Sequence, residues 1–534
     1  MKTSCAVIST ALCALVLLST TVAAAPVRID GGQLEGIVLP SGVRAWLGVP
    51  FAAPPVRDLR WKPPAPVRPW SGVMHAERAA PMCLQALRSR TMNHYFGNEA
   101  IGEDCLYLNI WSPPRGARLP VLVWIYGGGF NVGSASMANY SGEGLALAGV
   151  VRVNISYRLG PLGFLSHPDL SREEGGSSGN QGLADQIAAL RWIQNNIAVF
   201  GGDPGNVTIM GQSAGSMSVS LLQASPAAKG LFHRAVGMSG SHFAEPALPV
   251  PLKQGESEGL ALQKALGVSS VEAMRDIAAD RILAVAASVP RSSIVIDGRI
   301  VSGQANDVFA SGRQNDVPLM LGFTRDESFR SLGNVQSVAE LQAAVRREFP
   351  GNAEAILAAY PASDTASARR AATDIGRDAS LGVQMFAWAS AQQRWGRSPA
   401  FAYFFTRRQP YAPGITFIDH DPATAGAYHT GEVPYFLRTR ESLNLFRRTR
   451  DWEPADELLE SRMSGLLLSF ARTGQPVSLG VQQWPAFEPR QPRVLVLGTE
   501  MHIESWPDYA HLRLFEGPAS PVAGTPRSGT SPRD

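Results

Sequence analysis

A serine between two glycines is the first residue of this sequence that could carry chemistry. In "VTIMGQSAGS" (207–216), Ser213 follows an apolar, β-branched run and precedes small residues that can begin a helix. A G-x-S-x-G motif at a strand-to-helix turn exposes its serine hydroxyl to a substrate. The alternative is a tight turn in which Gly211 and Gly215 serve geometry alone. The strand before the motif and the helix after it favour a nucleophile at Ser213.

A serine hydroxyl needs a base that takes its proton, and the base needs an acid that orients it. At a nucleophile turn of this kind the acid and then the histidine follow the serine in the chain. The apolar run "VPLMLGF" (317–323) leads directly to Asp326 and Glu327. Spacing does not choose between these two carboxylates, nor among the four histidines that follow them, which are His420, His429, His502 and His511.

Three consecutive glycines offer backbone N–H groups for a developing oxyanion. They stand at 127–129 in "WIYGGGF", directly after the apolar run "PVLVW". Glycine lets the backbone approach a substrate closely, and preorganised N–H donors stabilise the charge of a tetrahedral intermediate. A flexible turn is the alternative. We predict the oxyanion role because the glycines follow a buried strand in a chain that also has a nucleophile turn.

Alternating strands and helices are predicted to position these groups. Leu183, Ile187, Leu190 and Ile193 recur at helical spacing in "GLADQIAALRWIQNNI" (182–197). This alternation predicts an α/β fold with a large, mainly parallel sheet and helices on both faces. A strand hairpin is expected in "VRIDGGQLEGIV" (27–38). Short apolar runs read as buried strands at 120–128, 149–157, 206–211, 234–240, 317–323, 400–405 and 493–498.

Composition limits the class of protein. The chain has 534 residues, of which 45% are hydrophobic and 17% charged, and we predict one large domain over 25–515. Its net charge of +3 is small and evenly spread, which argues against nucleic acid as a partner. The Pro/Ser/Gly-rich tail 516–534 is predicted to be disordered. The strong excess of arginine over lysine is typical of a GC-rich bacterial genome.

The first residues have the layout of a secretory signal peptide. Lys2 precedes a short apolar run and then small residues, so we predict cleavage after Ala24 and a secreted or periplasmic protein without stable membrane insertion. Two cysteines, Cys83 and Cys105, remain after this cleavage. In an exported chain they predict one disulfide. They do not predict a metal site, because no histidine lies at ligand spacing.

Beyond single motifs, the chain resembles the type-B carboxylesterases, the α/β-hydrolase family that includes the cholinesterases. The resemblance runs from about residue 27 to 515 and is specific, because many segments match in order. They include "GVPFAAPPVRDLRWKPP" (48–64), "EDCLYLNIW" (103–111), "VLVWIYGGGF" (121–130), "GNQGLADQIAALRWIQNNIAVFGGDPGNVTIMGQSAGS" (179–216), "FHRAVGMSGS" (232–241), "DVPLMLGFTRDE" (316–327) and "GAYHTGEVPYF" (426–436).

The resemblance implies which candidates act. Glu327 corresponds to the family's acid, with Asp326 as the fallback, and His429 corresponds to its base. Ser239 is similar to a serine that helps to hold the acid. Gln212 stands where many relatives carry glutamate, which weakens the case for a cationic, choline-type substrate. The resemblance implies that the oxyanion accepts from the N–H groups of Gly128, Gly129 and Ala214. It also implies a disulfide between Cys83 and Cys105 and a structural ion pair between Arg60 and Glu103.

The sequence therefore predicts an exported serine carboxylesterase that hydrolyses small-molecule esters through an acyl-enzyme, without a metal or organic cofactor. Two alternatives stay open. An amidase or carbamate hydrolase would use the same serine, histidine and glutamate. A non-catalytic, cholinesterase-like binding domain is the alternative outside the enzymes, and such domains typically lack one of these groups.

Overall fold

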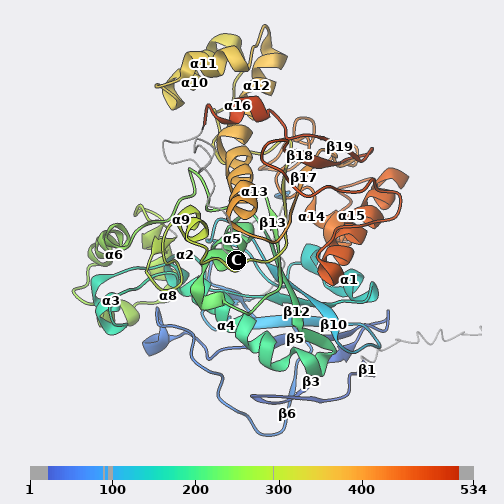
Figure 1. Ribbon diagram of the computed structural model, residues 1–534. Helices are drawn as coiled ribbons and strands as arrows, with labels where there is room; N and C mark the ends of the chain where they lie inside the picture. Colours follow the sequence, from blue (N-terminus) through green and yellow to red (C-terminus); the bar gives the residue numbers. More distant parts are fainter. Residues whose placement is uncertain (1–21, 88–90, 94–99, 293, 516–534) are drawn as a thin grey trace, which may run out of the picture.

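One twelve-stranded sheet forms the centre of the molecule (Figure 1). The computed structural model describes residues 22–87, 91–93, 100–292 and 294–515. From one edge of the sheet to the other, the strands are β1 (Val22–Ala23), β4 (Ile37–Val38), β5 (Arg44–Pro50), β9 (Tyr107–Ser112), β11 (Val151–Ile155), β10 (Leu119–Ile125), β12 (Gly202–Gln212), β13 (Arg234–Met238), β16 (Leu319–Thr324), β17 (Ala400–Phe405), β18 (Arg493–Leu497) and β19 (His502–Ser505).

The middle of this sheet is parallel, and its two edges are antiparallel. All neighbours from β11 to β18 pair in parallel, whereas the strands before β11 and the last strand, β19, pair antiparallel. Strands β11, β16 and β17 are buried along their whole length, which explains the nearly continuous apolar sequences of β16 and β17. Each strand predicted from an apolar run lies in this sheet, so the α/β prediction is confirmed.

Helices pack against the central strands. Helix α5 contacts β12 and β13, α13 contacts β16 and β17, and α15 contacts β10 and β12. In Figure 1 the strands β13 and β17 lie between α13 and α15. The principal helices are α1 (Glu143–Leu147), α2 (Gly160–Gly163), α3 (Pro168–Glu173), α4 (Gln181–Asn196), α5 (Ala214–Ala224), α6 (Leu252–Leu266), α7 (Val271–Arg275), α8 (Ala279–Ala286), α9 (Ala305–Ala310), α13 (Val383–Trp395), α14 (Val433–Leu437), α15 (Pro454–Thr473) and α16 (Tyr509–Leu512).

Three further helices form a lobe beside the main body, at the top of Figure 1. They are α10 (Val338–Glu348), α11 (Ala353–Ala359) and α12 (Thr365–Arg377). The lobe has its own hydrophobic cluster, distinct from the core that surrounds the sheet. Helix α12 begins at a capping box on Asp364, whose carboxylate accepts from the backbone N–H of Ser367 at 2.7 Å. The middle of α12 borders the cleft described below.

The N-terminal part contains the predicted hairpin and disulfide. Strands β2 (Val27–Ile29) and β3 (Gly32–Glu35) pair antiparallel, and β6 (Val73–His75) joins them in a three-stranded sheet. Cys83 and Cys105 form a disulfide, as predicted. The expected ion pair is also present. The Arg60 guanidinium donates to both carboxylate oxygens of Glu103, at 2.7 and 2.6 Å.

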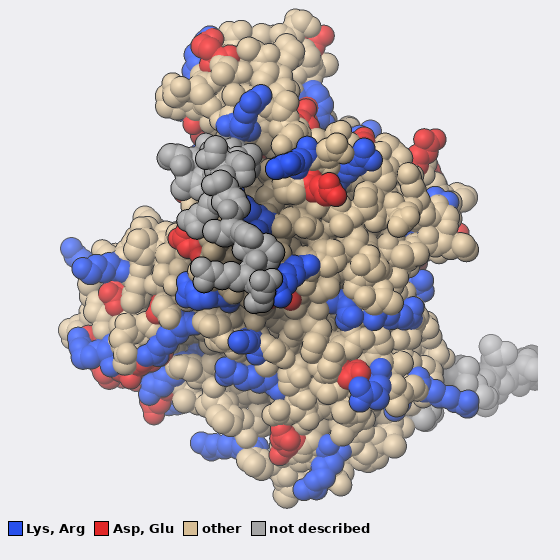
Figure 2. Space-filling model, viewed as in Figure 1, with Lys and Arg blue, Asp and Glu red and all other residues tan. Residues whose placement is uncertain are grey.

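The surface carries charges of both signs. Figure 2 shows basic and acidic side chains interspersed on this face, rather than gathered into one patch. In the described part of the chain, no helix combines the length and apolarity that a membrane crossing requires. The predicted signal peptide lies almost wholly outside the described residues, which begin at 22, and the predicted tail 516–534 lies wholly outside them.

Candidate active site

Ser213 stands on a sharp turn between β12 and α5. Its φ of 59° lies in the left-handed region, which a serine adopts only at a cost in conformational energy. Two backbone bonds hold the turn: its N–H donates to Met238 O at 2.8 Å, and its carbonyl accepts from Met217 N at 2.9 Å. The motif's second glycine is required by close packing, since a Cβ on Gly215 would lie 2.0 Å from Ile125 O.

The glycine triplet lies in contact with this turn. It follows β10, the parallel neighbour of β12. A Cβ on Gly127 would lie 2.5 Å from Gln212 O and 2.9 Å from Ser213 Cβ. Gly128 has a φ of 116°, and a Cβ there would lie 2.0 Å from Val132 O. These positions therefore require glycine, and the flexible-turn alternative does not explain that requirement.

The predicted oxyanion donors flank the serine from two directions. Gly128, Gly129 and Ser213 line the same cleft. Ala214 is the first residue of α5. The first N–H groups of a helix have no partner within the helix, so the Ala214 amide is free of helical pairing. One loop and one helix start thus bring the three predicted donors to Ser213.

Glu327 and His429 lie in direct contact. The imidazole Nδ1 hydrogen-bonds the carboxylate Oε2 of Glu327, and the other oxygen, Oε1, accepts from the backbone N–H of Thr324 at 2.6 Å. The Glu327 side chain is fully buried, whereas 31% of the His429 side chain is exposed. Burial opposes protonation of His429, but the charge and hydrogen bond of Glu327 outweigh it and raise the pKa of the imidazole.

The other candidates are engaged elsewhere. The Asp326 carboxylate pairs with the guanidinium of Arg370 and accepts from Ala427 N at 2.7 Å. His420 borders the same cleft, but its Nε2 hydrogen-bonds the Tyr411 hydroxyl. The remaining two candidate histidines are His502 on β19 and His511 on α16, and neither lines the cleft. Of the carboxylates and histidines that spacing left open, Glu327 and His429 are the two that contact each other at the cleft.

Gln212 contacts the base directly, which the sequence did not predict. Its amide nitrogen lies 3.0 Å from His429 Nε2 and 3.4 Å from Nδ1. With Nδ1–H donating to Glu327, Nε2 carries a lone pair that can accept from this amide. Gln212 therefore stabilises the neutral imidazole, which is the form that can act as a base.

A second buried carboxyl, that of Glu432, lies near Glu327. Ser239, expected to hold Glu327, is instead placed with its Oγ 3.4 Å from Glu432 Oε1. Tyr403 donates its hydroxyl to the same oxygen at 3.3 Å. Burial, and then the charge of Glu327, raise the pKa of Glu432 to about 7. The sequence signal for it was an acid three positions after His429, inside the otherwise apolar "EVPYF" segment.

One cleft of about 1040 Å³ is lined by Gln212, Ser213, Glu327 and His429. The edge of the Phe329 ring meets the His429 imidazole, with the ring centres 5.2 Å apart. Arg369 and Arg370 border the cleft from α12, and the loop 419–421 contributes two carboxylates and a histidine. The volume is at the upper end of the range for small-molecule sites, and the lining is more polar than usual.

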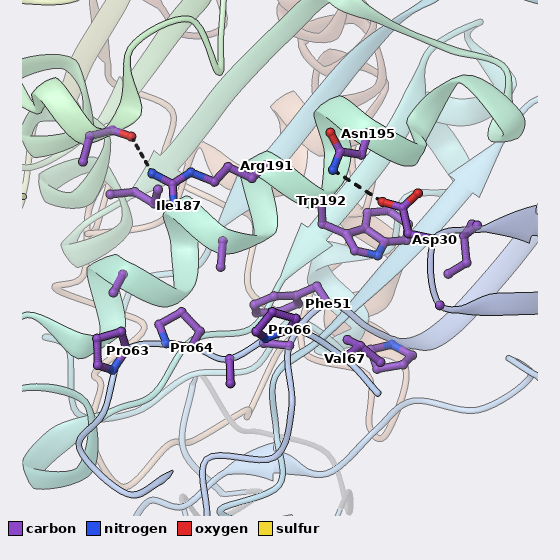
Figure 3. Close-up of a pocket in the computed structure, with 18 of the residues that line it drawn as sticks. Asp30, Phe51, Pro63, Pro64, Pro66, Val67, Ile187, Arg191, Trp192 and Asn195 are labelled. Atoms are coloured by element: carbon purple, nitrogen blue, oxygen red, sulfur yellow. Dashed lines mark hydrogen bonds between the residues drawn. The ribbon is translucent and has the colours of Figure 1, made fainter. Parts of the chain in front are cut away.

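A second hollow, of about 450 Å³, lies between α4 and the proline-rich loop 63–67 (Figure 3). Phe51, Trp192 and Ile187 form apolar walls, and Arg191 is at one end. Its lining contains no serine, cysteine or histidine. Asp30 is the carboxylate of its lining, and no hydroxyl, thiol or imidazole accompanies it there, so the cleft at Ser213 is the better candidate active site.

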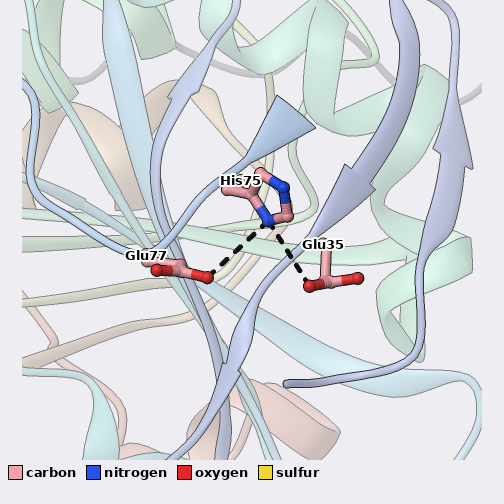
Figure 4. Close-up of side chains that lie close together, drawn as sticks. All are labelled: Glu35, His75 and Glu77. Atoms are coloured by element: carbon pink, nitrogen blue, oxygen red, sulfur yellow. Dashed lines mark ion pairs between the residues drawn. The ribbon is translucent and has the colours of Figure 1, made fainter. Parts of the chain in front are cut away.

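One cluster has the donor types of a metal site. Glu35 and His75 are directly opposed on β3 and β6, and Glu77 follows two residues later, so the three side chains meet (Figure 4). His75 Nδ1 lies 3.4 Å from Glu35 Oε1 and 3.7 Å from Glu77 Oε1. The imidazole is 63% exposed, and none of the three lines the cleft. The cluster is exposed and lies away from the cleft, so we assign it no part in the chemistry.

The sheet order and the serine on its strand-to-helix turn define the class of α/β-hydrolases. The chain matches the model of the Carboxylesterase family over residues 23–514, and it belongs to this family.

Three curated relatives and one solved structure illustrate the match. The chain is 36% identical to fumonisin B1 esterase of Sphingopyxis macrogoltabida, covering 88% of this chain and 86% of the relative. It is 32% identical to para-nitrobenzyl esterase of Bacillus subtilis (89% and 95%) and 33% identical to human cocaine esterase (87% and 86%). A solved structure of pNB esterase superposes with a TM-score of 0.78 at 31% identity, covering 92% of this chain and 99% of that one. The protein is a carboxylic ester hydrolase.

Proposed function

We propose that the protein is an exported serine carboxylesterase in which Ser213, His429 and Glu327 act as a catalytic triad. The observation that carries this proposal is the contact between His429 and the buried Glu327, at the cleft that Ser213 also lines. Glu327 orients the imidazole and stabilises its charged form. The raised pKa of His429 agrees with that role.

In the proposed reaction, Ser213 Oγ attacks the ester carbonyl carbon while His429 Nε2 takes the hydroxyl proton. The tetrahedral oxyanion accepts from the N–H groups of Gly128, Gly129 and Ala214. His429 then gives the proton to the leaving alcohol, and an acyl-enzyme remains. A water molecule, deprotonated by the same nitrogen, hydrolyses the acyl-enzyme and releases the carboxylic acid. For His429 Nε2 to reach the serine, the Gln212 amide must give up its contact with that nitrogen.

Replacement of the nucleophile tests the proposal. Ser213→Ala should lower kcat for p-nitrophenyl acetate by about 10⁴-fold or more, since loss of a single triad member removes most of the catalysis. A fluorophosphonate probe should label the wild type and not this variant. Ser469→Ala, on the exposed face of α15, is the matched control and should keep both properties. Turnover within tenfold of the wild type in a folded Ser213→Ala protein would exclude Ser213 as the nucleophile.

A bulky ester is the substrate class that the cleft favours. Its volume of about 1040 Å³ exceeds what a short acyl ester fills, and one relative is named for the esters of fumonisin B1. We expect kcat/KM to rise with acyl and alcohol size across a panel of p-nitrophenyl and p-nitrobenzyl esters, and fumonisin B1 belongs in that panel. Matched anilides test the amidase alternative, which requires anilide turnover comparable with ester turnover.

Export is supported by the signal-like sequence of residues 1–24 and by the disulfide between Cys83 and Cys105. Mass spectrometry of the mature protein should find an N-terminus at Ala25. A chain that retains its first 24 residues in the cytoplasm would contradict this part of the proposal.

A further inference from the structure

The carbonyl groups of Gly128 and Gly129 are held by the residues that follow them. Gly128 O accepts from both Asn131 N and Val132 N, each at 3.1 Å. The same peptide unit carries the N–H of Gly129, because a carbonyl and the next N–H lie in one plane. Fixing Gly128 O therefore fixes the direction of the N–H that is expected to meet the oxyanion.

The Asn131 side chain holds the next peptide unit. Its Nδ2 donates to Gly129 O at 2.7 Å, and its Oδ1 accepts from Arg291 Nη2 at 3.0 Å. With its backbone N–H on Gly128 and its amide on Gly129, Asn131 clamps both peptide units that follow the predicted donors. Arg291 reaches this clamp from a segment 160 residues further along the chain.

Arg291 is placed there at a cost. Burial lowers the pKa of its guanidinium. Its Nε and Nη1 are buried, and within the described residues they find no hydrogen-bond partner. A buried cation with unsatisfied donors is unfavourable by itself. Within the described residues its guanidinium hydrogen-bonds Asn131 through Nη2, so this arrangement preserves the contact at the glycine loop.

We propose that Asn131 and Arg291 are positioning residues of the oxyanion hole. Arg291 fixes the Asn131 amide, and Asn131 fixes the peptide units on both sides of the Gly129 Cα, so the Gly129 N–H is oriented before the substrate arrives. The proposal rests on the proposed function, since it needs an oxyanion at Gly128 and Gly129. Preorganised donors act on charge that develops in the transition state, so their loss lowers kcat more than it raises KM.

Asn131→Asp is the sharpest test, because aspartate keeps the shape and the acceptor for Arg291 but cannot donate to Gly129 O. We expect kcat for p-nitrophenyl acetate to fall about tenfold, less than the 10²- to 10³-fold loss when a whole donor is removed. KM should stay within about twofold. The affinity for an alkyl boronic acid, which forms a tetrahedral adduct with the serine, should fall in parallel with kcat.

Arg291 is tested by a matched pair of variants. Arg291→Gln should lower kcat several-fold, and Arg291→Lys, which keeps a charged donor, should restore most of it. Arg281→Gln, on the neighbouring α8, is the control for loss of an arginine in this region and should leave kcat unchanged. The double variant Asn131→Ala with Arg291→Gln should be no slower than Asn131→Ala alone, because the two residues act through one contact.

Several results would overturn the proposal. It fails if Asn131→Asp keeps wild-type kcat and boronate affinity, or if KM rises while kcat does not change. It also fails if Arg291→Lys is as slow as Arg291→Gln. If Asn131→Asp does not fold, the Arg291 pair and the boronate measurement decide alone. Failure of the proposed function is distinguishable, since an active Ser213→Ala protein removes the oxyanion at this site altogether.

Discussion

Replacing Gln212 by glutamate should shift the pH dependence of the reaction. In the structure the Gln212 amide lies 3.0 Å from His429 Nε2, where it favours the neutral ring. A carboxylate at this position would favour the imidazolium instead. Because only neutral His429 can take the serine proton, kcat/KM falls as the pH drops below the pKa of His429. Gln212→Glu raises that pKa, so the acid limb of the profile moves to higher pH.

The size of the shift follows from the geometry. Two unit charges about 4 Å apart interact by roughly 1 kcal/mol in bulk water and by roughly 4 kcal/mol at an effective dielectric constant of about 20. At about 1.4 kcal/mol per pH unit, these limits correspond to shifts of about 0.7 and 3 units. The His429 side chain is 31% exposed, which places it between the limits. We expect a shift of about 1 to 2 units.

The assay is kcat/KM for p-nitrophenyl acetate across the acid limb, with Gln212→Met as the control. Methionine has similar length and no charge, and it donates no hydrogen bond to the ring. Losing the donor that favours the neutral ring raises the pKa of His429, so its acid limb should also move upward, but by less than with glutamate, which adds a charge. Glutamate and methionine variants with the same acid limb would refute the electrostatic reasoning. An acid limb that moves to lower pH in Gln212→Glu would refute the contact itself.

Three further predictions follow from the same region and the N-terminal disulfide. Burial raises the pKa of Glu432 to about 7, above its unfolded value, so its contribution to stability is present at low pH and lost as the pH rises toward 7. The free energy of unfolding of the wild type, measured in urea, should therefore fall between about pH 4 and pH 7. That of Glu432→Gln should fall less over the same range, by a few kcal/mol. Equal pH dependence of the two proteins would contradict this. Gly128→Ala would put a methyl group 2.0 Å from a backbone oxygen at a φ of 116°, and we expect kcat to fall about 10²-fold, with KM measured alongside. The Cys83→Ser, Cys105→Ser variant opens a loop with a sequence separation of 22 and should lose about 3 kcal/mol of unfolding free energy; a loss under about 1 kcal/mol would show that the loop is held by other contacts.

The central sheet was predictable because its strands are apolar along their whole length. Burial on both faces leaves a continuous run in the sequence, as in "AFAYFF" for β17. The nucleophile turn was predictable for a related reason, since close packing at Gly127 and Gly215 leaves glycines in fixed positions. Both features are local, and their causes lie within a few residues of their signals.

The contacts around the base were not predictable in this way. Gln212 and His429 are 217 residues apart, and Asn131 and Arg291 are 160 apart. The residues next to each partner give no signal of the contact, because it forms only when the chain folds and brings distant segments together. The contact of Ser239 with Glu432 was not predictable for the same reason, because the fold and not the chain brings these two residues together.

The wide spacing of the catalytic groups has a consequence during synthesis of the chain. Ser213 leaves the ribosome 216 residues, and Gly128 301 residues, before His429, the base of the proposed triad. A nascent or truncated chain that ends before His429 therefore contains the proposed nucleophile and oxyanion donors but not the proposed base. Esterase turnover therefore indicates that the whole central sheet has formed. A fragment or partly unfolded molecule in which β16 and β17 have separated from β12 should be inert toward the esters around it.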